Sequence, residues 1–134
     1  MIRKMYANKR KIKQLANQIG FDIVKFTDAK SFKKNEASAV ERVRSGLMDG
    51  LPWYSEERAI LSNNPKKLMP EAESIISLAI CYNNSDKTPI EPGPHGKIAK
   101  YAWGDDYHEV IKKMLRTFVK ELQETVDSNI KTRI

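Results

Sequence analysis

The nine residues SIISLAICY, from Ser74 to Tyr82, decide the fold that we expect for this chain. They form a nearly continuous apolar run of strand length, which is typical of a strand covered on both faces. We therefore expect this run to be a central strand of a sheet. Cys81, the single cysteine of the sequence, lies inside the run. We expect its thiol to be buried, because free cysteine packs as a small hydrophobic group.

Helical and extended patterns alternate before this strand. Apolar residues recur at helical spacing over residues 8–19, and Gly20 follows them as a helix stop. Residues 21–27 carry the pattern of a short strand. A second helix is expected over residues 36–45, and a short third helix is expected to begin after a cap at Ser55. The second helix is expected to share one apolar face among Val40, Val43 and Leu47.

The pattern changes after the central strand. Residues 83–96 are rich in proline and glycine and predict an exposed loop, and residues 97–103 predict a short extended segment. Asp105 or Asp106 is expected to cap a long helix that ends near residue 126. The apolar stripe expected on that helix consists of Tyr107, Val110, Ile111, Met114, Leu115, Phe118, Leu122 and Val126.

The order of these elements predicts an α/β fold with helices packed around a mostly central sheet. A length of 134 residues supplies one core of ordinary size, so we expect one domain over residues 1–134. Residues 130–134 resemble the start of another strand, at which the sequence stops. We therefore expect an incomplete unit.

Charge and composition limit the class of protein. The chain has 24 Lys and Arg against 17 Asp and Glu, a net charge of +7, which favours attraction to a polyanion such as RNA. A solvated basic face without a partner is the alternative. No apolar run reaches the ~18 residues of a membrane span, and we expect a cytoplasmic protein without membrane contact. One cysteine and two histidines argue against a disulfide framework or a metal site built by this chain.

The segment from Gly96 to His108 gathers the groups that are best suited to binding. Three aromatic residues, two lysines, two carboxylates and a histidine lie between a predicted loop and the first turn of a predicted helix. Backbone N–H groups at a helix start can hold an anionic group, and the rings offer surfaces to a planar ligand. The alternative is purely structural: Asp105 or Asp106 caps the helix and His108 lies on the surface.

Five short motifs together resemble one family. They are GFD at residues 20–22, LPWY at 51–54, LMPEA at 68–72, SIISLA at 74–79 and YAWGDDYH at 101–108. In this order they resemble the amino-terminal domain of epoxyqueuosine reductases, and the last motif is the most specific.

The resemblance implies a fold, an activity and a set of site residues. It implies part of a nitroreductase-like, cobalamin-binding α/β domain, which full-length members combine with a ferredoxin-like domain that carries two [4Fe–4S] clusters and a helical-repeat tail that helps to hold tRNA. Such enzymes reduce epoxyqueuosine to queuosine in tRNA. By position, Ala99, Lys100, Tyr101 and Trp103 are implied to lie along the cobalamin-facing segment. Asp106, Tyr107 and His108 are implied to lie beside it at the helix start.

Two departures from the family pattern limit what this chain is expected to do. The family's proton-donating aspartate lies in a Val-Asp-Thr-Gly-like motif beyond a strand similar to residues 130–134, and the sequence stops before it. The cluster cysteines are also absent from this sequence. We therefore expect an amino-terminal fragment that is inactive alone, has no catalytic or metal-binding residue of its own and depends on carboxy-terminal domains.

Two other functions remain open at this point. One is a relative of the cobalamin-dependent reductive dehalogenases, which act on small organohalides. The other is a non-catalytic basic interaction module. The positive charge favours tRNA over a small neutral substrate, because a small neutral substrate gives no reason for a basic surface.

Overall fold

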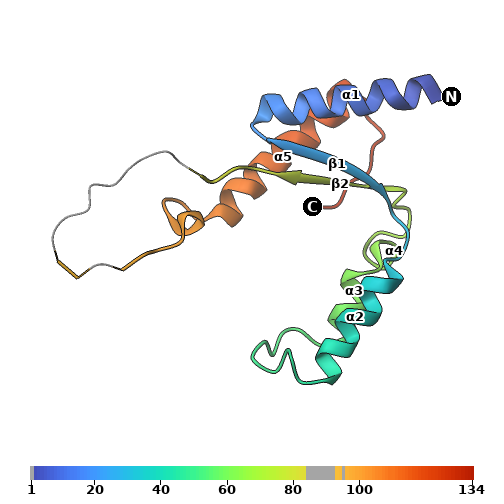
Figure 1. The fold of residues 1–134 in the computed structure, drawn as a ribbon. Coiled ribbons are helices and arrows are strands. Elements are labelled where there is room, and N and C mark those ends of the chain that lie inside the picture. The colour runs from blue at the N-terminus through green and yellow to red at the C-terminus, as the bar shows by residue number, and fades with distance from the viewer. Residues whose placement is uncertain (1, 84–92, 95) are drawn as a thin grey trace. The chain divides into compact units, whose positions relative to one another are not determined.

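The computed structural model describes residues 2–83, 93–94 and 96–134, with side chains from Asn8 onward. Helices and strands alternate, as the α/β prediction requires (Figure 1). The elements are α1 (Ile2–Ile19), β1 (Ile23–Asp28), α2 (Lys33–Arg44), α3 (Glu56–Ser62), α4 (Pro65–Leu68), β2 (Ser74–Ala79), the 3-10 helix η1 (Lys100–Ala102) and α5 (Tyr107–Thr125). The chain divides into two compact units, one formed by Met1–Val24 with Ser77–Ile134 and the other by Lys25–Ile76.

The two predicted strands form and pair with each other. Near one end of the pair the Asp22 N–H donates to the Ala79 carbonyl over 2.9 Å, and near the other the Ala29 N–H donates to the Glu73 carbonyl over 3.1 Å. Residue numbers rise along one strand as they fall along the other, so β1 and β2 are antiparallel. Within the described residues the sheet has these two strands.

The expectation that β2 is a central strand covered on both faces is wrong for the part of the chain that the structure describes. Ser74, Ser77 and Ala79 are exposed, and no residue of β2 is fully buried. Cys81 is exposed as well, so the prediction of a buried thiol is also wrong. Hydrophobicity marks these residues for burial, but coverage depends on neighbouring elements, and the apolar pattern does not say which elements supply it.

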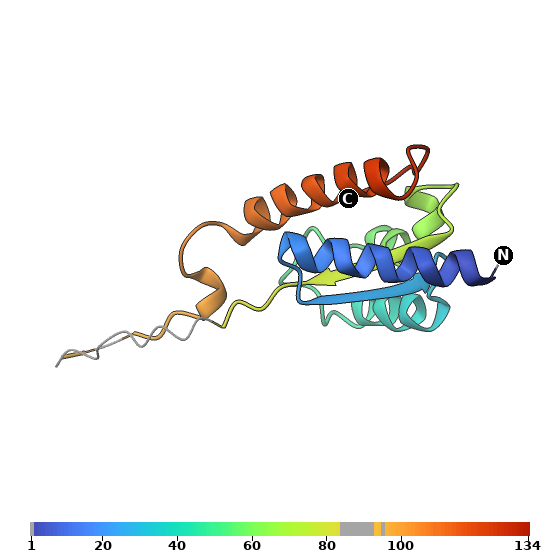
Figure 2. The ribbon, with the colours of Figure 1, turned by 90° about the horizontal axis from the view of Figure 1, so that it is seen from above.

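Helices α1 and α5 pack against each other, and they lie side by side in both views (Figure 1 and Figure 2). Phe118 and Leu122 of α5 are buried with Leu15 and Ala16 of α1. The Phe118 ring meets the Phe21 ring edge to face, with 6.2 Å between centroids. The carboxy-terminal half of the predicted α5 stripe thus forms a core.

Gly20 ends α1 as the sequence predicts. Its φ of +110° lies in the region that favours glycine. The Gly20 N–H donates to the Asn17 carbonyl and the Phe21 N–H donates to the Ala16 carbonyl, over 3.1 and 3.0 Å. This pair of bonds is the Schellman motif, which satisfies carbonyls left unpaired at a helix end.

The unit Lys25–Ile76 holds α2, α3 and α4. Ser55 caps α3 as predicted, because its hydroxyl accepts the Arg58 N–H over 3.2 Å. Arg44 and Glu56 form a two-bond ion pair at 3.0 and 2.8 Å. Leu47 is 74% exposed and does not share a face with the half-buried Val40 and Val43, because α2 ends at Arg44.

Three carboxy-terminal expectations have different outcomes. Residues 97–103 contain η1, a single 3-10 turn, where an extended segment was expected. Residues 130–134 form no strand; the Gln123 amide donates to the Ile130 carbonyl over 2.9 Å. Most of the predicted loop, residues 84–92 and 95, lies outside the described residues.

Among the helices in the described ranges, none combines the length and the apolar character of a membrane span.

Candidate functional site

An exposed row of aromatic rings lies in the unit Met1–Val24 with Ser77–Ile134. The Tyr82 and Tyr101 ring centroids are 6.3 Å apart, and those of Tyr101 and Tyr107 are 5.9 Å apart, both edge to face. Tyr107 then stacks on His108 at 4.0 Å. Tyr82, Tyr101 and Tyr107 are 61%, 52% and 42% exposed. We call these four residues the ring row. Much of the aromatic surface of its three tyrosines is uncovered.

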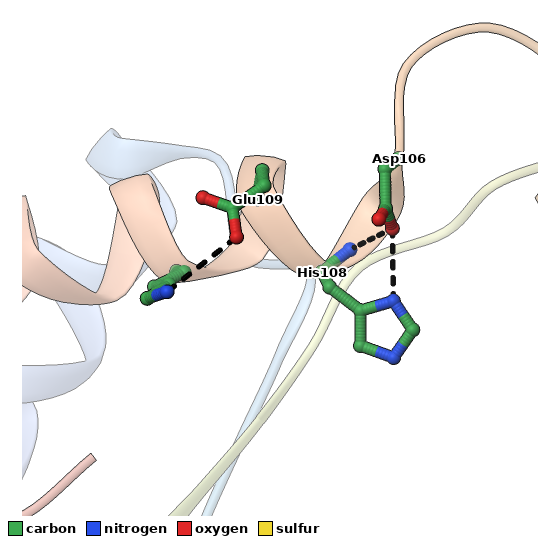
Figure 3. Close-up of polar contacts among 4 residues, drawn as sticks. Asp106, His108 and Glu109 are labelled. Carbon is green, nitrogen blue, oxygen red and sulfur yellow. Dashed lines mark hydrogen bonds and ion pairs between the residues drawn. The ribbon is translucent and has the colours of Figure 1, made fainter.

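Asp106 fixes the first turn of α5 and the histidine beside it. One carboxylate oxygen, Oδ1, accepts the His108 N–H over 2.9 Å and lies 2.8 Å from His108 Nδ1 (Figure 3). These bonds to the charged form hold the pKa of Asp106 below its ordinary value. Facing a carboxylate, Nδ1 is the donor, so Nε2 of the neutral ring is an acceptor. The His108 side chain is 69% exposed, and Nε2 is available to a ligand.

The turn before α5 is held by two further side chains. Lys100 Nζ donates to Asn83 Oδ1 over 2.7 Å, and Trp103 Nε1 donates to the Ile98 carbonyl over 3.0 Å. Ala99 caps the start of η1, and its carbonyl accepts the Ala102 N–H over 2.9 Å. The Lys100–Asn83 bond joins the residues after β2 to the segment that carries Tyr101, and the other two bonds are local to that segment.

The seven residues singled out in the sequence therefore fall into two groups. Tyr101, Asp106, Tyr107 and His108 lie together in or beside the ring row, whereas Ala99, Lys100 and Trp103 shape the turn that precedes it. Tyr82 and Asn83 are not among the seven residues singled out from the sequence. Their signal is their place at and just after the end of the apolar run 74–82, where a side chain can reach the segment that follows the predicted loop.

An open hollow of about 930 Å³ lies between the end of α1 and the first half of α5. It is lined by Gln18, Ile19, Asp105, Asp106, Glu109, Val110, Lys113, Met114 and Thr117. This hollow explains why Val110, predicted within the apolar stripe, is exposed. Within the described residues, Asp106 belongs to both the hollow and the surroundings of the ring row.

Known proteins resemble this chain over most of its length. An epoxyqueuosine reductase from Leadbetterella byssophila is 32% identical over 117 residues, which are 87% of this chain and 37% of the relative. The solved epoxyqueuosine reductase from Bacillus subtilis superposes with a TM-score of 0.76 and 25% identity, covering 96% of this chain and 34% of that one. A crystal structure of an epoxyqueuosine reductase with an epoxyqueuosine-modified tRNA-Tyr stem loop gives a TM-score of 0.70 and 25% identity, covering 91% and 32%.

The chain thus spans about a third of the length of these relatives. The family model described as "Epoxyqueuosine reductase QueG, DUF1730" matches residues 63–134, which include β2, η1, α5 and the whole ring row. Because that match covers more than half of the 134 residues, this chain belongs to the epoxyqueuosine reductase family.

Proposed function

We propose that this chain forms part of the cobalamin-binding domain of an epoxyqueuosine reductase, an oxidoreductase of queuosine biosynthesis that acts on tRNA in the cytoplasm. The single observation that carries the proposal is the family match over residues 63–134, the segment that contains the exposed ring row. The match favours this function over that of a reductive dehalogenase relative.

The residues of the ring row fit the chemistry of cobalamin. A corrin is a broad, largely apolar disc edged with amide groups. Tyr82, Tyr101 and Tyr107 offer uncovered aromatic surface, and Lys100 and Asn83 offer polar groups beside it that suit an amide edge. When bound, cobalamin supplies the redox-active cobalt. The rings would hold and orient the corrin, and Asp106 would hold His108 with Nε2 toward the ligand.

The substrate and the remaining parts of the enzyme are further elements of the proposal. A related enzyme has been solved with a tRNA stem loop, and the net charge of +7 supports attraction to RNA. Each [4Fe–4S] cluster takes four thiolates, and this chain has one cysteine. We therefore propose that two clusters and a helical-repeat tail lie in other portions of the working enzyme, and that this chain alone does not turn over substrate.

Cobalamin binding by the full chain tests the proposal. Hydroxocobalamin is titrated into the protein and the change in its visible absorbance gives the Kd. The double variant Tyr101→Ala/Tyr107→Ala removes two rings of the row and is expected to raise the Kd at least about tenfold, since each lost ring removes buried apolar contact. Far-ultraviolet circular dichroism verifies that the helix content of the chain is unchanged.

The matched control is Trp53→Ala. Trp53 is another exposed aromatic residue, at 65%, and it lies in the unit Lys25–Ile76. Its removal is expected to leave the Kd within about twofold. Equal loss in both variants, or no cobalamin binding by the unaltered chain, would count against the ring row as the cofactor surface and favour a non-catalytic interaction module.

A further inference from the structure

The positive charge of the chain is concentrated on one helix. The sequence of α1 contains six Lys and Arg residues and no Asp or Glu. Helix α5 differs, because its four Lys and Arg residues are interleaved with three Glu residues. On α5, Lys112 pairs with Glu109 at 3.4 Å and Lys120 with Glu124 at 3.9 Å. Helix α1 thus has no acidic side chain of its own to offset its charge.

The geometry of α1 places several of these cations on one exposed surface. Leu15 and Ala16 mark its buried face. With 3.6 residues per turn, Lys9 and Lys13 follow each other in one row that begins at the edge of that face, and Arg10 lies in the next row, farther from it. All three are exposed. We call Lys9, Arg10 and Lys13 the α1 cationic stripe.

The residues around the stripe suit phosphate groups. Gln14 continues the row of Arg10, Asn17 continues that of Lys13, and both amides are exposed. Phosphate oxygens are bound in proteins by Arg and Lys together with amide side chains, in contacts that carry no sequence information. The sequence of α1 contains one aromatic residue, Tyr6, against six Lys and Arg residues, and base stacking relies on aromatic side chains. The stripe therefore fits a nucleic-acid backbone better than its bases.

Like charges four residues apart on a helix repel each other and lower its stability, and a bound polyanion would offset this repulsion. A pair such as Lys9 and Lys13 destabilises a helix by about 0.2–0.5 kcal/mol. Lys11 differs, since its ammonium donates to the Thr125 carbonyl near the end of α5, where a cation is favoured. The structure thus gives Lys11 a structural role at the end of α5, and Lys11 is not counted in the stripe.

We propose that the α1 cationic stripe binds the sugar-phosphate backbone of RNA and anchors it without reading its sequence. The choice of RNA as the polyanion rests on the proposed function. The stripe itself rests on the charge and geometry of α1. Neither the ring row nor the hollow beside α5 contributes to this surface.

The test measures binding of a fluorescein-labelled tRNA anticodon stem loop to the full chain by anisotropy at several salt concentrations. Lys9→Gln/Arg10→Gln/Lys13→Gln removes the stripe and keeps helix propensity. Its matched control, Lys112→Gln/Arg116→Gln/Lys120→Gln, removes three cations from α5. The stripe variant is expected to bind at least about tenfold more weakly near 0.1 M salt. For this variant, the slope of log Kd plotted against the logarithm of the salt concentration is expected to be smaller by about 2. Three phosphate contacts are lost, and each contributes about 0.7–0.9 to the slope.

The control is expected to stay within about threefold of the unaltered chain. Equal losses of RNA affinity in the two variants would contradict the proposal, because the net charge of the chain would then explain the binding. Binding of the unaltered chain to phosphatidylserine vesicles but not to RNA would also overturn it. Cobalamin titration of the same samples separates the two proposals. If the unaltered chain binds cobalamin and RNA, and the stripe variant binds RNA as tightly as the unaltered chain, the stripe is not the RNA-binding surface and the proposed function is unaffected.

Discussion

At Gly20 the backbone conformation selects against a side chain. The residue has a φ of +110°, and a Cβ added there would meet Met114 Cε at 3.4 Å. Gly20→Ala is therefore expected to lower the free energy of unfolding by at least about 1 kcal/mol, because the positive φ strains any L side chain. Urea denaturation followed by circular dichroism measures the loss.

Gly50→Ala is the matched control for this change. Nothing lies within 4 Å of a Cβ added at Gly50, and its φ is outside the strained range. Its free energy of unfolding is expected to stay within about 0.5 kcal/mol of the unaltered chain. Similar losses in both variants would show that the end of α1 does not depend on the conformation of Gly20.

Residues whose role is set by their immediate neighbours could be predicted from the sequence. Gly20 as a helix stop, Ser55 as a helix cap and Asp106 as one of two candidate caps each follow from short-range chemistry. The exposure of Cys81 and the contact of Tyr82 with Tyr101 could not be predicted, because both depend on segments distant in the sequence.

Among the elements, the packing of α1 against α5 is accompanied by an aromatic contact between α5 and the residue that follows Gly20. Phe118 is 4% exposed and meets Phe21 edge to face. Phe118→Ala is expected to lower the free energy of unfolding by about 3 kcal/mol or more, since the lost ring leaves a cavity that the helices fill only in part. Phe118→Leu keeps most of the volume and is expected to cost less.

Val110→Ala is the control on the same helix. Val110 is 37% exposed beside the hollow, so its loss is expected to cost under about 1 kcal/mol. Urea midpoints of the three variants give the comparison. An equal effect of Phe118→Ala and Val110→Ala would mean that the Phe118 ring does not hold the two helices together.

Periodicity locates β1, α2, α3, β2 and α5 to within a few residues, but it does not predict α4 or η1, and it does not predict what surrounds any element. The apolar run at β2 predicts a strand, which forms, and a covered position, which the described residues do not provide. The stripe on α5 predicts one buried face, yet burial is complete only at Phe118 and Leu122, because the hollow opens beside the first half of the helix. The periodicity of apolar residues shows which face of one helix or strand is apolar. Whether that face is buried depends on the other elements that pack against it.

Over the whole molecule, four surface carboxylates share one electrostatic feature. Hydrogen bonds from nearby groups lower the pKa of each below its ordinary value, 3.8 for Asp and 4.5 for Glu. The carboxylates are Asp28, Glu56, Glu57 and Asp106, and their principal partners are, in order, Lys30, Arg44, Ser55 and His108. They occur in both compact units, so their effect on stability is distributed.

The sign of the resulting pH dependence follows from these lowered pKa values. A carboxylate with a lower pKa in the folded state stabilises the fold above its unfolded pKa, and the contribution is lost as pH falls through the folded pKa. The urea midpoint is therefore expected to be level from about pH 7 to 5.5 and to fall below about pH 4.5. Because the groups lie at the surface, added salt is expected to weaken the dependence.

Replacing the four carboxylates with amides isolates this effect. The variant Asp28→Asn/Glu56→Gln/Glu57→Gln/Asp106→Asn is expected to have a lower urea midpoint at pH 7 and a flatter decline toward pH 3, since the groups that lose their bonds on protonation are gone. Asp105→Asn, a change in an exposed carboxylate beside the α5 cap, is expected to keep the original slope. If the quadruple variant has an unaltered acid slope, the pH dependence arises from other groups, and these four carboxylates have no measurable part in folding.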